Sequence, residues 1–429
     1  MPNNQNQQYK DTLDLLRFQY GVDKIYSWSR INCFLEDKWT YFLKYVLKVK
    51  PDRADSIYGT LGTALHTQME EFYTTNIDNK TMTTNFESAY IAAKEMFGRS
   101  FVYVNPNADE ETKQACIAAN EKLARKFVNS VKHFLTNVVK DEGLVECEKF
   151  YPCVLTDSKG KNYLIQCFID FLNWKEDGKV DIIDYKTSTF YQNAKAEKLK
   201  RQLEFYALAF QQNENVPISD INLAWNFVKY IQVEYPQANG KLKSRRLERD
   251  EIGGVLDPES GMYKDGLQSA LKTIFNNAKK FNLVGQYSED EINEYLYEVG
   301  MSNSLDCLPE EVKKLFTFSN CLRPIEYNEA EKIVLEGFIV GTIKEIEHLE
   351  ELYEQTKDEN LWWQDVTYDD VYRLENLSEY SPRLHKPYQA YLQAKKEREE
   401  AGDTNPEIIG GSAFNKLWGA KANKQNTEE

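Results

Sequence analysis

The sequence lacks any long apolar run. Hydrophobic residues make up 41% of the 429-residue chain, yet no stretch approaches the roughly 20 consecutive apolar residues that a membrane-spanning helix needs. The first residues, MPNNQNQQYKDT, are polar and contain no apolar segment of the kind found in secretory signals. The sequence therefore predicts a cytoplasmic protein with no membrane partner.

Cysteine is scarce and scattered. The chain has seven cysteines, an odd number, and none of them forms a Cys-x-x-Cys pair. This pattern argues against a disulfide framework and against a zinc ribbon. Most of the cysteines are expected to be small buried hydrophobic residues.

Basic residues are fewer than acidic ones. The chain has 53 Lys and Arg and 68 Asp and Glu, which gives a net charge of −15. Such a balance argues against a protein that coats nucleic acid through bulk electrostatics. It leaves room for a local basic channel or for a phosphate contact bridged by a metal. There is no Walker A motif, so an ATP-driven helicase would have to be a separate chain.

The order of helical and strand patterns along the sequence predicts an α/β protein with a helical C-terminal region. Residues 25 to 140 are mostly helical in pattern, and GTLGTALHTQMEEFYTT places Leu61, Leu65, Met69 and Phe72 on one helix face. The following segment is rich in strand patterns. We predict a flexible leader, a core, a mostly helical extension and a polar tail, at 1–24, 25–235, 236–400 and 401–429.

Two strands of the predicted core form a hairpin. YLIQCFIDFLNW and KVDIIDYKT are joined by KEDGK, which has the residues of a tight turn. Residues two apart on a strand point to the same face, so Asp184 and Lys186 are predicted to lie side by side. Asp170, in CFIDFL, is expected to lie on the neighbouring strand.

Two aspartates buried on paired strands repel each other unless positive charge lies between them. One lysine would compensate only in part, whereas a divalent cation would do so fully. Oxygen ligands are those that Mg²⁺ and Mn²⁺ prefer. A metal held here could polarise a phosphoryl oxygen and lower the pKa of a bound water.

Each of these residues alone has a simpler interpretation. His66 would more often be a partly buried histidine with satisfied hydrogen bonds, and Asp184 with Lys186 would more often be an ion pair. Asp170 is harder to dismiss, because aspartate is disfavoured inside a strand. The order of the whole set along the chain carries the prediction.

That order resembles the PD-(D/E)XK phosphodiesterase superfamily, and within it the RecB-like exonuclease branch, which includes CRISPR-associated adaptation nucleases and phage nucleases. The matching motifs are Gly62-x-x-x-His66 in GTLGTALH, the aspartate of FID, DYK, and Gln202-x-x-x-Tyr206 in QLEFYA; YSWSRINCF resembles the opening Ser-x-Ser segment. They span about half of the chain. The resemblance implies a restriction-endonuclease-like core, with a mixed central sheet flanked by helices.

The resemblance also implies roles for these residues. His66, Asp170, Asp184 and the backbone carbonyl of Tyr185 would ligate Mg²⁺ or Mn²⁺. Lys186 would orient or activate the attacking water and stabilise negative charge. Gln202 and Tyr206, four apart on one helix face, would hold Lys186, the phosphate or the DNA strand.

The chain departs from the branch in its cysteines. Many RecB-like nucleases bind an iron–sulfur cluster through one cysteine before the core and three after it. Cys33 matches the first position, but WWQDVTYDDVYRLENLSEYSPRLHKPYQAYL contains no cysteine, and Cys307 and Cys321 are isolated. We therefore predict no cluster, with packing or ion pairs in its place.

Two further sets of charged residues are weaker candidates. The segment KLKSRRLERD could grip a phosphate backbone or be a solvated loop; its basic residues are Lys241, Lys243, Arg245, Arg246 and Arg249. Glu146 and Glu148 could contact the metal site, although a solvated strand edge is the better interpretation.

The leading hypothesis is a metal-dependent DNA exonuclease that leaves a 5′-phosphate, as the resemblance implies, with a role in DNA recombination or repair. Its partners would be linear or single-stranded DNA and a separate helicase, recombinase or single-strand-binding protein. The alternatives are a non-catalytic DNA-binding or scaffold protein on the same fold, and a nuclease that acts on RNA. The intact aspartates and lysine argue against the scaffold; no feature separates DNA from RNA.

Overall fold

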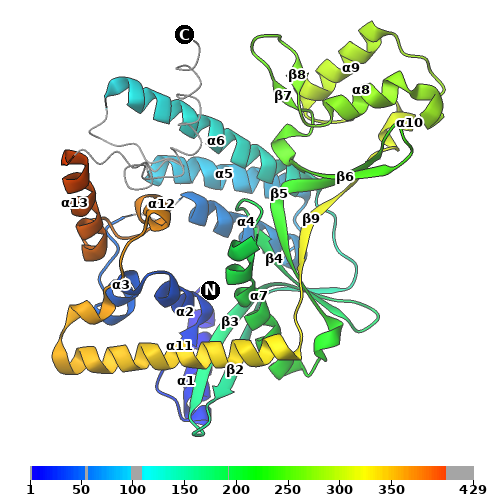
Figure 1. Ribbon diagram of the computed structural model, residues 1–429. Helices are drawn as coiled ribbons and strands as arrows, with labels where there is room; N and C mark the ends of the chain where they lie inside the picture. Colours follow the sequence, from blue (N-terminus) through cyan, green and yellow to red (C-terminus); the bar gives the residue numbers. More distant parts are fainter. Residues whose placement is uncertain (1, 54–56, 98–108, 192, 402–429) are drawn as a thin grey trace.

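The computed structural model describes residues 2–53, 57–97, 109–191 and 193–401. Within these residues the centre of the molecule is a mixed sheet of seven strands (Figure 1). The strand order is β1-β3-β4-β5-β6, with β2 also paired to β3 and β9 also paired to β5. The strands are β1 Ile25–Ser27, β2 Leu144–Thr156, β3 Asn162–Trp174, β4 Val180–Lys186, β5 Ile221–Pro236, β6 Leu242–Glu248 and β9 Thr317–Ile325.

The predicted hairpin is confirmed. Strands β3 and β4 pair in antiparallel fashion, with Phe171 opposite Ile183, and the turn closes through a hydrogen bond from the Lys175 amide to the Lys179 carbonyl (2.8 Å). Gly178 has a positive φ of 84° in this turn, a conformation that glycine adopts without steric cost. Helix α7 (Asn193–Glu214) then connects β4 to β5, which lies parallel to β4.

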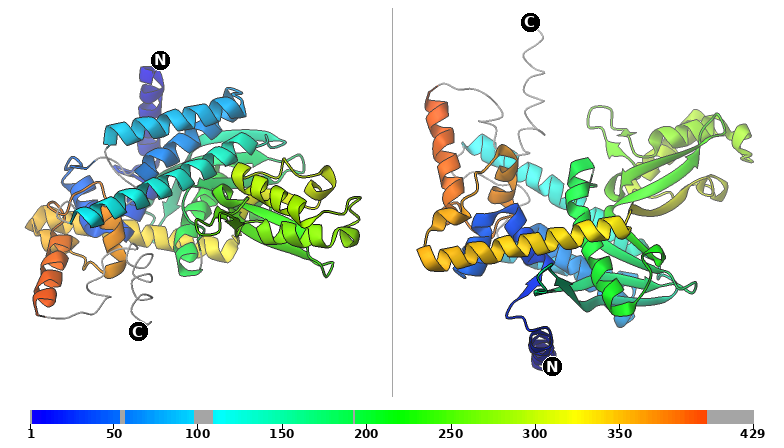
Figure 2. Two further views of the ribbon diagram at one scale, coloured as in Figure 1. Left: turned by 90° about the horizontal axis from the view of Figure 1, so that it is seen from above. Right: turned by 60° about the horizontal axis from the view of Figure 1, so that its bottom comes forward.

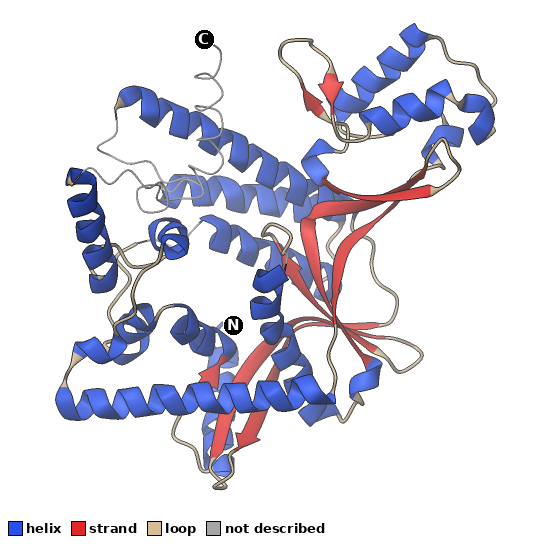
Figure 3. Cartoon of the chain, viewed as in Figure 1, coloured by secondary structure: helices blue, strands red, loops and turns tan. Residues whose placement is uncertain are grey.

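Helices cover both faces of the sheet (Figure 3). Alternation along the strands places Leu172 and Ile182 in a cluster with α2 (Trp28–Glu36), α7 and α11 (Glu329–Thr356). It places Phe171 and Tyr185 in a second cluster with α4 (Ile57–Thr74), α5 (Asn79–Phe97) and α6 (Glu110–Asn137). The predicted helix face of Leu61, Leu65, Met69 and Phe72 is buried as expected. The α/β class is therefore confirmed.

The N-terminal segment predicted as a flexible leader forms a helix, α1 (Pro2–Tyr20). Its Tyr9 hydroxyl donates a hydrogen bond to Gln166 of β3 (2.8 Å), and the Tyr9 ring contacts Phe150 and Phe168. The rest of the helix projects from the body (Figure 2), and Phe18 is 89% exposed. The contact with β3 explains why this polar segment has a defined position.

The region after residue 235 is helical in large part, but it also contributes strands that the sequence pattern did not predict. β6 pairs with the far half of β5, and β9 pairs with both halves of it. The far half of β5, β6 and three helices contribute to a separate hydrophobic cluster. We call this unit the second lobe; it lies at the upper right of Figure 1. Its other elements are β7 Val255–Leu256, β8 Tyr263–Lys264, α8 Gln268–Asn276, α9 Glu289–Ser302 and α10 Glu310–Lys313. The predicted boundary at 235 falls inside β5.

The C-terminal segment packs against the first helices of the core. Trp362 is fully buried and stacks on Tyr41 and Phe42, which lie at the end of α3 (Lys38–Tyr41) and just after it. Two further helices follow, α12 (Tyr368–Asn376) and α13 (Lys386–Glu400). The polar tail predicted at 401–429 lies, apart from residue 401, outside the described residues.

A buried carboxylate links the start of the core to the C-terminal helices. Asp37, between α2 and α3, is 4% exposed. Its oxygens accept hydrogen bonds from the Trp39 and Thr40 amides, from His385 Nε2 (2.8 Å) and from Arg373 Nη1 (3.1 Å). Ion pairs thus join the start of the core to the C-terminal helices. Nowhere in the described ranges is a helix both long enough and apolar enough to cross a membrane.

Candidate metal centre

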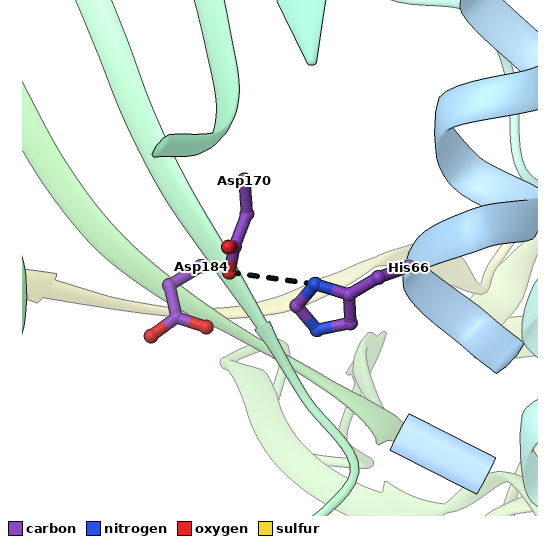
Figure 4. A group of neighbouring side chains, drawn as sticks. All are labelled: His66, Asp170 and Asp184. Atoms are coloured by element: carbon purple, nitrogen blue, oxygen red, sulfur yellow. Dashed lines mark ion pairs between the residues drawn. The ribbon is translucent and has the colours of Figure 1, made fainter. Parts of the chain in front are cut away.

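Three elements bring together the side chains predicted to bind a metal. His66 comes from α4, Asp170 from the middle of β3 and Asp184 from β4, and one ligand atom from each lies within 4.8 Å of the others (Figure 4). The antiparallel register places the two aspartates on neighbouring strands, and the helix supplies the histidine from the side.

The two carboxylates have little protein compensation. Asp184 is 0% exposed, and apart from the Lys186 ammonium no described donor contacts its oxygens. Its ion pair with Lys186, at 2.5 Å from Nζ to Oδ2, is the compensating contact. Burial, and then the charge of Asp184, raise the pKa of Asp170 well above its usual range. Carboxylate oxygens that are buried and short of donors suit a divalent cation, so these residues fit the metal.

His66 is oriented by its own second ring nitrogen. Nε2 lies 3.0 Å from the Tyr185 carbonyl oxygen, so Nε2 carries the proton and donates to that carbonyl. Nδ1 is then left facing the carboxylates, 3.5 Å from Asp170 Oδ2. Such a hydrogen bond to the distal nitrogen is how metal-binding histidines are held. The carbonyl keeps a second lone pair, so a metal contact for Tyr185 stays a prediction.

Burial opposes a charge on His66, but the nearby carboxylate of Glu148 and the charges of Asp170 and Asp184 raise its pKa to about 9. The same carboxylates that would hold a cation therefore favour the protonated imidazole when no metal is bound. His66 and the aspartates form one electrostatic unit.

The other predicted residues form a chain from Lys186. Its Nζ donates to Gln202 Oε1 (3.4 Å), and Gln202 Nε2 donates to the Tyr206 hydroxyl (2.9 Å). Although burial opposes it, the charge of Asp184 raises the pKa of Lys186. The ammonium is thus held between a carboxylate and an amide, in position to stabilise negative charge.

Glu148 belongs to this site more closely than the sequence suggested. Its Oε1 lies 3.8 Å from His66 Nδ1. Glu148 has a φ of 49°, a left-handed conformation that is uncommon for residues other than glycine, and it interrupts the pairing between Cys147 and Lys149 of β2. Strained backbone of this kind is enriched at functional sites. The spacing of Glu146 and Glu148 was the only sequence signal, and it could not show the kink.

A cavity of about 380 Å³ opens beside the metal centre. Its lining includes Asp170 and Glu148, Ser29 and Asn32 of α2, and Lys198, Gln202 and Tyr206 of α7. The Asp170 carboxylate therefore borders a space that a substrate phosphate could enter.

The basic segment does not form one exposed patch. Lys241 and Lys243 are exposed on and beside β6, but Arg246 stacks over Phe190, with its Cζ 3.6 Å from the ring centre. Arg245 donates to the Gly266 carbonyl (2.9 Å), and Arg249 is only 2% exposed. Three of the five residues therefore have structural contacts, and a role of this segment in binding nucleic acid stays a prediction.

Comparison with known families identifies the fold. The model of the PD-(D/E)XK nuclease superfamily matches residues 26–297, which is more than half of the chain. The chain belongs to the PD-(D/E)XK nuclease superfamily. Its sheet and flanking helices are the restriction-endonuclease-like core of that superfamily, whose members are hydrolases that cleave nucleic acids with divalent metals.

Other comparisons are less informative. No curated protein matches the sequence. Among solved structures, the crystal structure of SSO0001 is similar at 15% identity; the match covers 51% of this PD-(D/E)XK chain and 77% of that one, with a TM-score of 0.16. A score this low carries no argument about function.

Proposed function

We propose that this PD-(D/E)XK protein is a metal-dependent DNA exonuclease of the RecB-like branch. One observation carries the proposal: Asp184 is fully buried beside Asp170, and the Lys186 ammonium is the one donor in the described residues that contacts its oxygens. A single ammonium compensates two buried carboxylates only in part, and the uncompensated charge is costly. A divalent cation removes this cost, and its position beside Lys186 suits phosphodiester hydrolysis.

Each residue of the metal centre has a proposed role that follows from its position. Asp170, Asp184 and His66 hold Mg²⁺ or Mn²⁺, which supplies a polarised phosphoryl oxygen and a bound water of lowered pKa. Lys186 orients the attacking water and stabilises the charge that develops on the phosphate. Gln202 and Tyr206 hold Lys186 in place. Attack on phosphorus in line with the leaving 3′ oxygen breaks the P–O3′ bond and leaves a 5′-phosphate.

The proposal extends to cofactors and partners. We propose that the chain works without an iron–sulfur cluster, because ion pairs from Asp37 to the C-terminal helices already join the two segments that a cluster would link. A helicase, recombinase or single-strand-binding protein would be a separate partner, and the setting would be cytoplasmic DNA recombination or repair. Residues 25–235 would carry the catalysis.

The test is digestion of end-labelled linear, nicked and circular DNA, and of linear RNA, with Mg²⁺ or Mn²⁺ and with EDTA. Release of short products from linear DNA alone, abolished by EDTA, is the expected result. Cleavage of circles would make the protein an endonuclease, and cleavage of RNA alone would make it a ribonuclease. Binding of DNA without any cleavage would identify the scaffold alternative.

Glu148 gives a graded prediction. We expect Glu148→Gln to weaken metal-dependent activity by about 10-fold, because the carboxylate adds negative charge beside the His66 nitrogen that faces the metal, and groups just outside the ligand set commonly contribute 10- to 100-fold. The measurement is activity as a function of Mn²⁺ concentration, with the midpoint moving to higher concentration. Glu146→Gln is the matched control, since Glu146 instead contacts Lys149 and Trp174. Equal effects of both substitutions would contradict the role of Glu148.

A further inference from the structure

A second cavity, of about 780 Å³, lies between the core and the second lobe. Its walls come from the end of α6, the β3–β4 turn, β9 and the connection between α9 and α10. This volume falls in the range of roughly 300 to 1,000 Å³ that is typical of small-molecule sites. The lining does not include any of the residues placed at the metal centre.

A buried arginine lies at the base of this cavity. Arg249 is 2% exposed and donates to three neutral acceptors: the Tyr230 carbonyl (3.0 Å), His133 Nδ1 (3.3 Å) and Asn320 Oδ1 (3.1 Å). No carboxylate in the described residues forms an ion pair with it. Neutral acceptors satisfy its hydrogen bonds, and its Cζ lies 5.3 Å from the centre of the Phe134 ring. No anion balances its charge, which is costly in a buried place.

The two side chains that accept from Arg249 are left with donors. Asn137 Nδ2 also points to His133 Nδ1, at 3.5 Å, so Nδ1 is the acceptor and Nε2 carries the proton. Burial, and then the charge of Arg249, lower the pKa of His133 to about 4, which is consistent with this neutral tautomer. Because Asn320 uses its oxygen on Arg249, its amide NH₂ is also left to donate. Both residues line the cavity.

The lining also carries charged side chains of both signs, namely Lys140, Lys175, Lys313, Asp141, Glu142 and Asp306. Lys175 and Lys313 pair with Asp181 and Glu310, outside the lining, and Asp141 accepts from the Tyr73 hydroxyl. The three carboxylates are exposed to solvent, which screens their charge, whereas Arg249 is buried. The imidazole N–H of His133 and the amide NH₂ of Asn320 can donate hydrogen bonds to an oxyanion. The guanidinium of Arg249, which has no ion-pair partner among the described residues, supplies the positive charge.

We propose that this interlobe cavity binds a phosphate-bearing ligand of mononucleotide size, with His133 and Asn320 as donors and Arg249 as the compensating charge. The volume exceeds what inorganic phosphate alone would fill. The phosphate has two possible sources, a free nucleotide or a terminal nucleotide of a nucleic-acid chain. The proposal does not depend on the nuclease function.

The test is thermal unfolding in EDTA, so that the metal centre contributes nothing. The ligands are sodium phosphate, deoxyadenosine 5′-monophosphate and a short oligodeoxynucleotide, each compared with NaCl at the same ionic strength. At one hundred times Kd, the monophosphate is expected to raise the melting temperature of the wild-type protein by about 3 °C. Stabilisation by the oligonucleotide alone would identify the chain as the source of the phosphate. No shift beyond that of NaCl would overturn the proposal.

Two variants and a control separate binding from packing. Arg249→Met is expected to abolish the ligand-induced shift. Asn320→Asp supplies an internal carboxylate, so it should raise the melting temperature without ligand and also abolish the shift; it keeps the test decisive if Arg249→Met fails to fold. Lys126→Met is the control, because Lys126 ties α6 to the second lobe through Glu248 and Glu251 (2.7 Å each) but lies outside the cavity. A full shift in Arg249→Met or Asn320→Asp, or its loss in Lys126→Met, would contradict the proposed site.

Discussion

Substituting Asp184 by Asn or Lys186 by Met is expected to reduce the nuclease activity by at least about 10³-fold while leaving the fold intact. Asp184→Asn removes the charge that pairs with the Lys186 ammonium and that we propose holds the metal. Lys186→Met keeps the length and packing of the side chain and removes only the cation. The measurement is the rate of digestion of end-labelled linear DNA at saturating Mn²⁺, with circular dichroism as the check on folding.

These two variants distinguish metal binding from catalysis. Mn²⁺ should raise the melting temperature of the wild-type protein and of Lys186→Met, but not that of Asp184→Asn, since only the last has lost a metal ligand. Asp181→Asn is the matched control: it lies on the same strand but pairs with Lys175 (3.1 Å), away from the centre. Full activity of Asp184→Asn, or equal losses in Asp181→Asn, would refute the assignment of the site.

The second large effect concerns the carboxylate that anchors the C-terminal helices. Asp37→Asn should lower the free energy of unfolding by roughly 3 to 5 kcal/mol, because one partner of a buried ion pair is removed while Arg373 remains. Its new amide NH₂ would also face the donors of His385 and Arg373. Thermal unfolding measures the loss, and limited proteolysis between 357 and 385 shows whether the helices have detached.

An exposed ion pair of the same region supplies the control. Glu359 pairs with Lys386 at the surface, with side chains 40% and 58% exposed, and exposed pairs contribute about 0 to 1 kcal/mol. Glu359→Gln should therefore leave the melting temperature almost unchanged. A small effect of Asp37→Asn, similar to that of Glu359→Gln, would show that packing of Trp362 alone holds the C-terminal region.

The Asp37 contribution should also depend on pH. Burial alone would raise the pKa of Asp37, but the hydrogen bond with His385 and the charges of His385 and Arg373 lower it well below its usual range. A carboxyl with a depressed folded-state pKa stabilises the fold above its unfolded-state pKa of about 3.9 and loses this stabilisation as the pH falls further. The difference in stability between the wild-type protein and Asp37→Asn should thus be full at pH 7 and shrink below about pH 4.

The sequence predicted those parts of the molecule that local patterns encode. The β3–β4 hairpin has strand alternation on both sides of a glycine turn, and His66, Asp170, Asp184 and Lys186 keep a spacing that matches a known family. Their convergence follows from the pairing of two strands that are adjacent in sequence. The order of motifs therefore contained enough information to place the candidate metal centre.

Other features depend on contacts between distant segments. β9 is exposed along most of its length and shows no alternation of buried and exposed residues, so its pairing with β5 is what makes it a strand. Arg249 lies in a basic segment whose sequence is typical of a solvated loop. It is buried because α6 and β9 pack against it. Glu148 reaches the site through a backbone kink in β2. No periodicity in the sequence records any of these three.

The length of β5 bears on how the protein can be divided. Its first half pairs with β4 and its far half pairs with β6, while β9 pairs with residues 223–226 and 231–234 of both halves. A chain cut after Pro236 would strip both neighbours from residues 231–234 and expose the apolar side chains of Ile231 and Val233. Unpaired apolar strand edges promote aggregation. A catalytic fragment should therefore keep residues 237–325, even though none of them holds the metal.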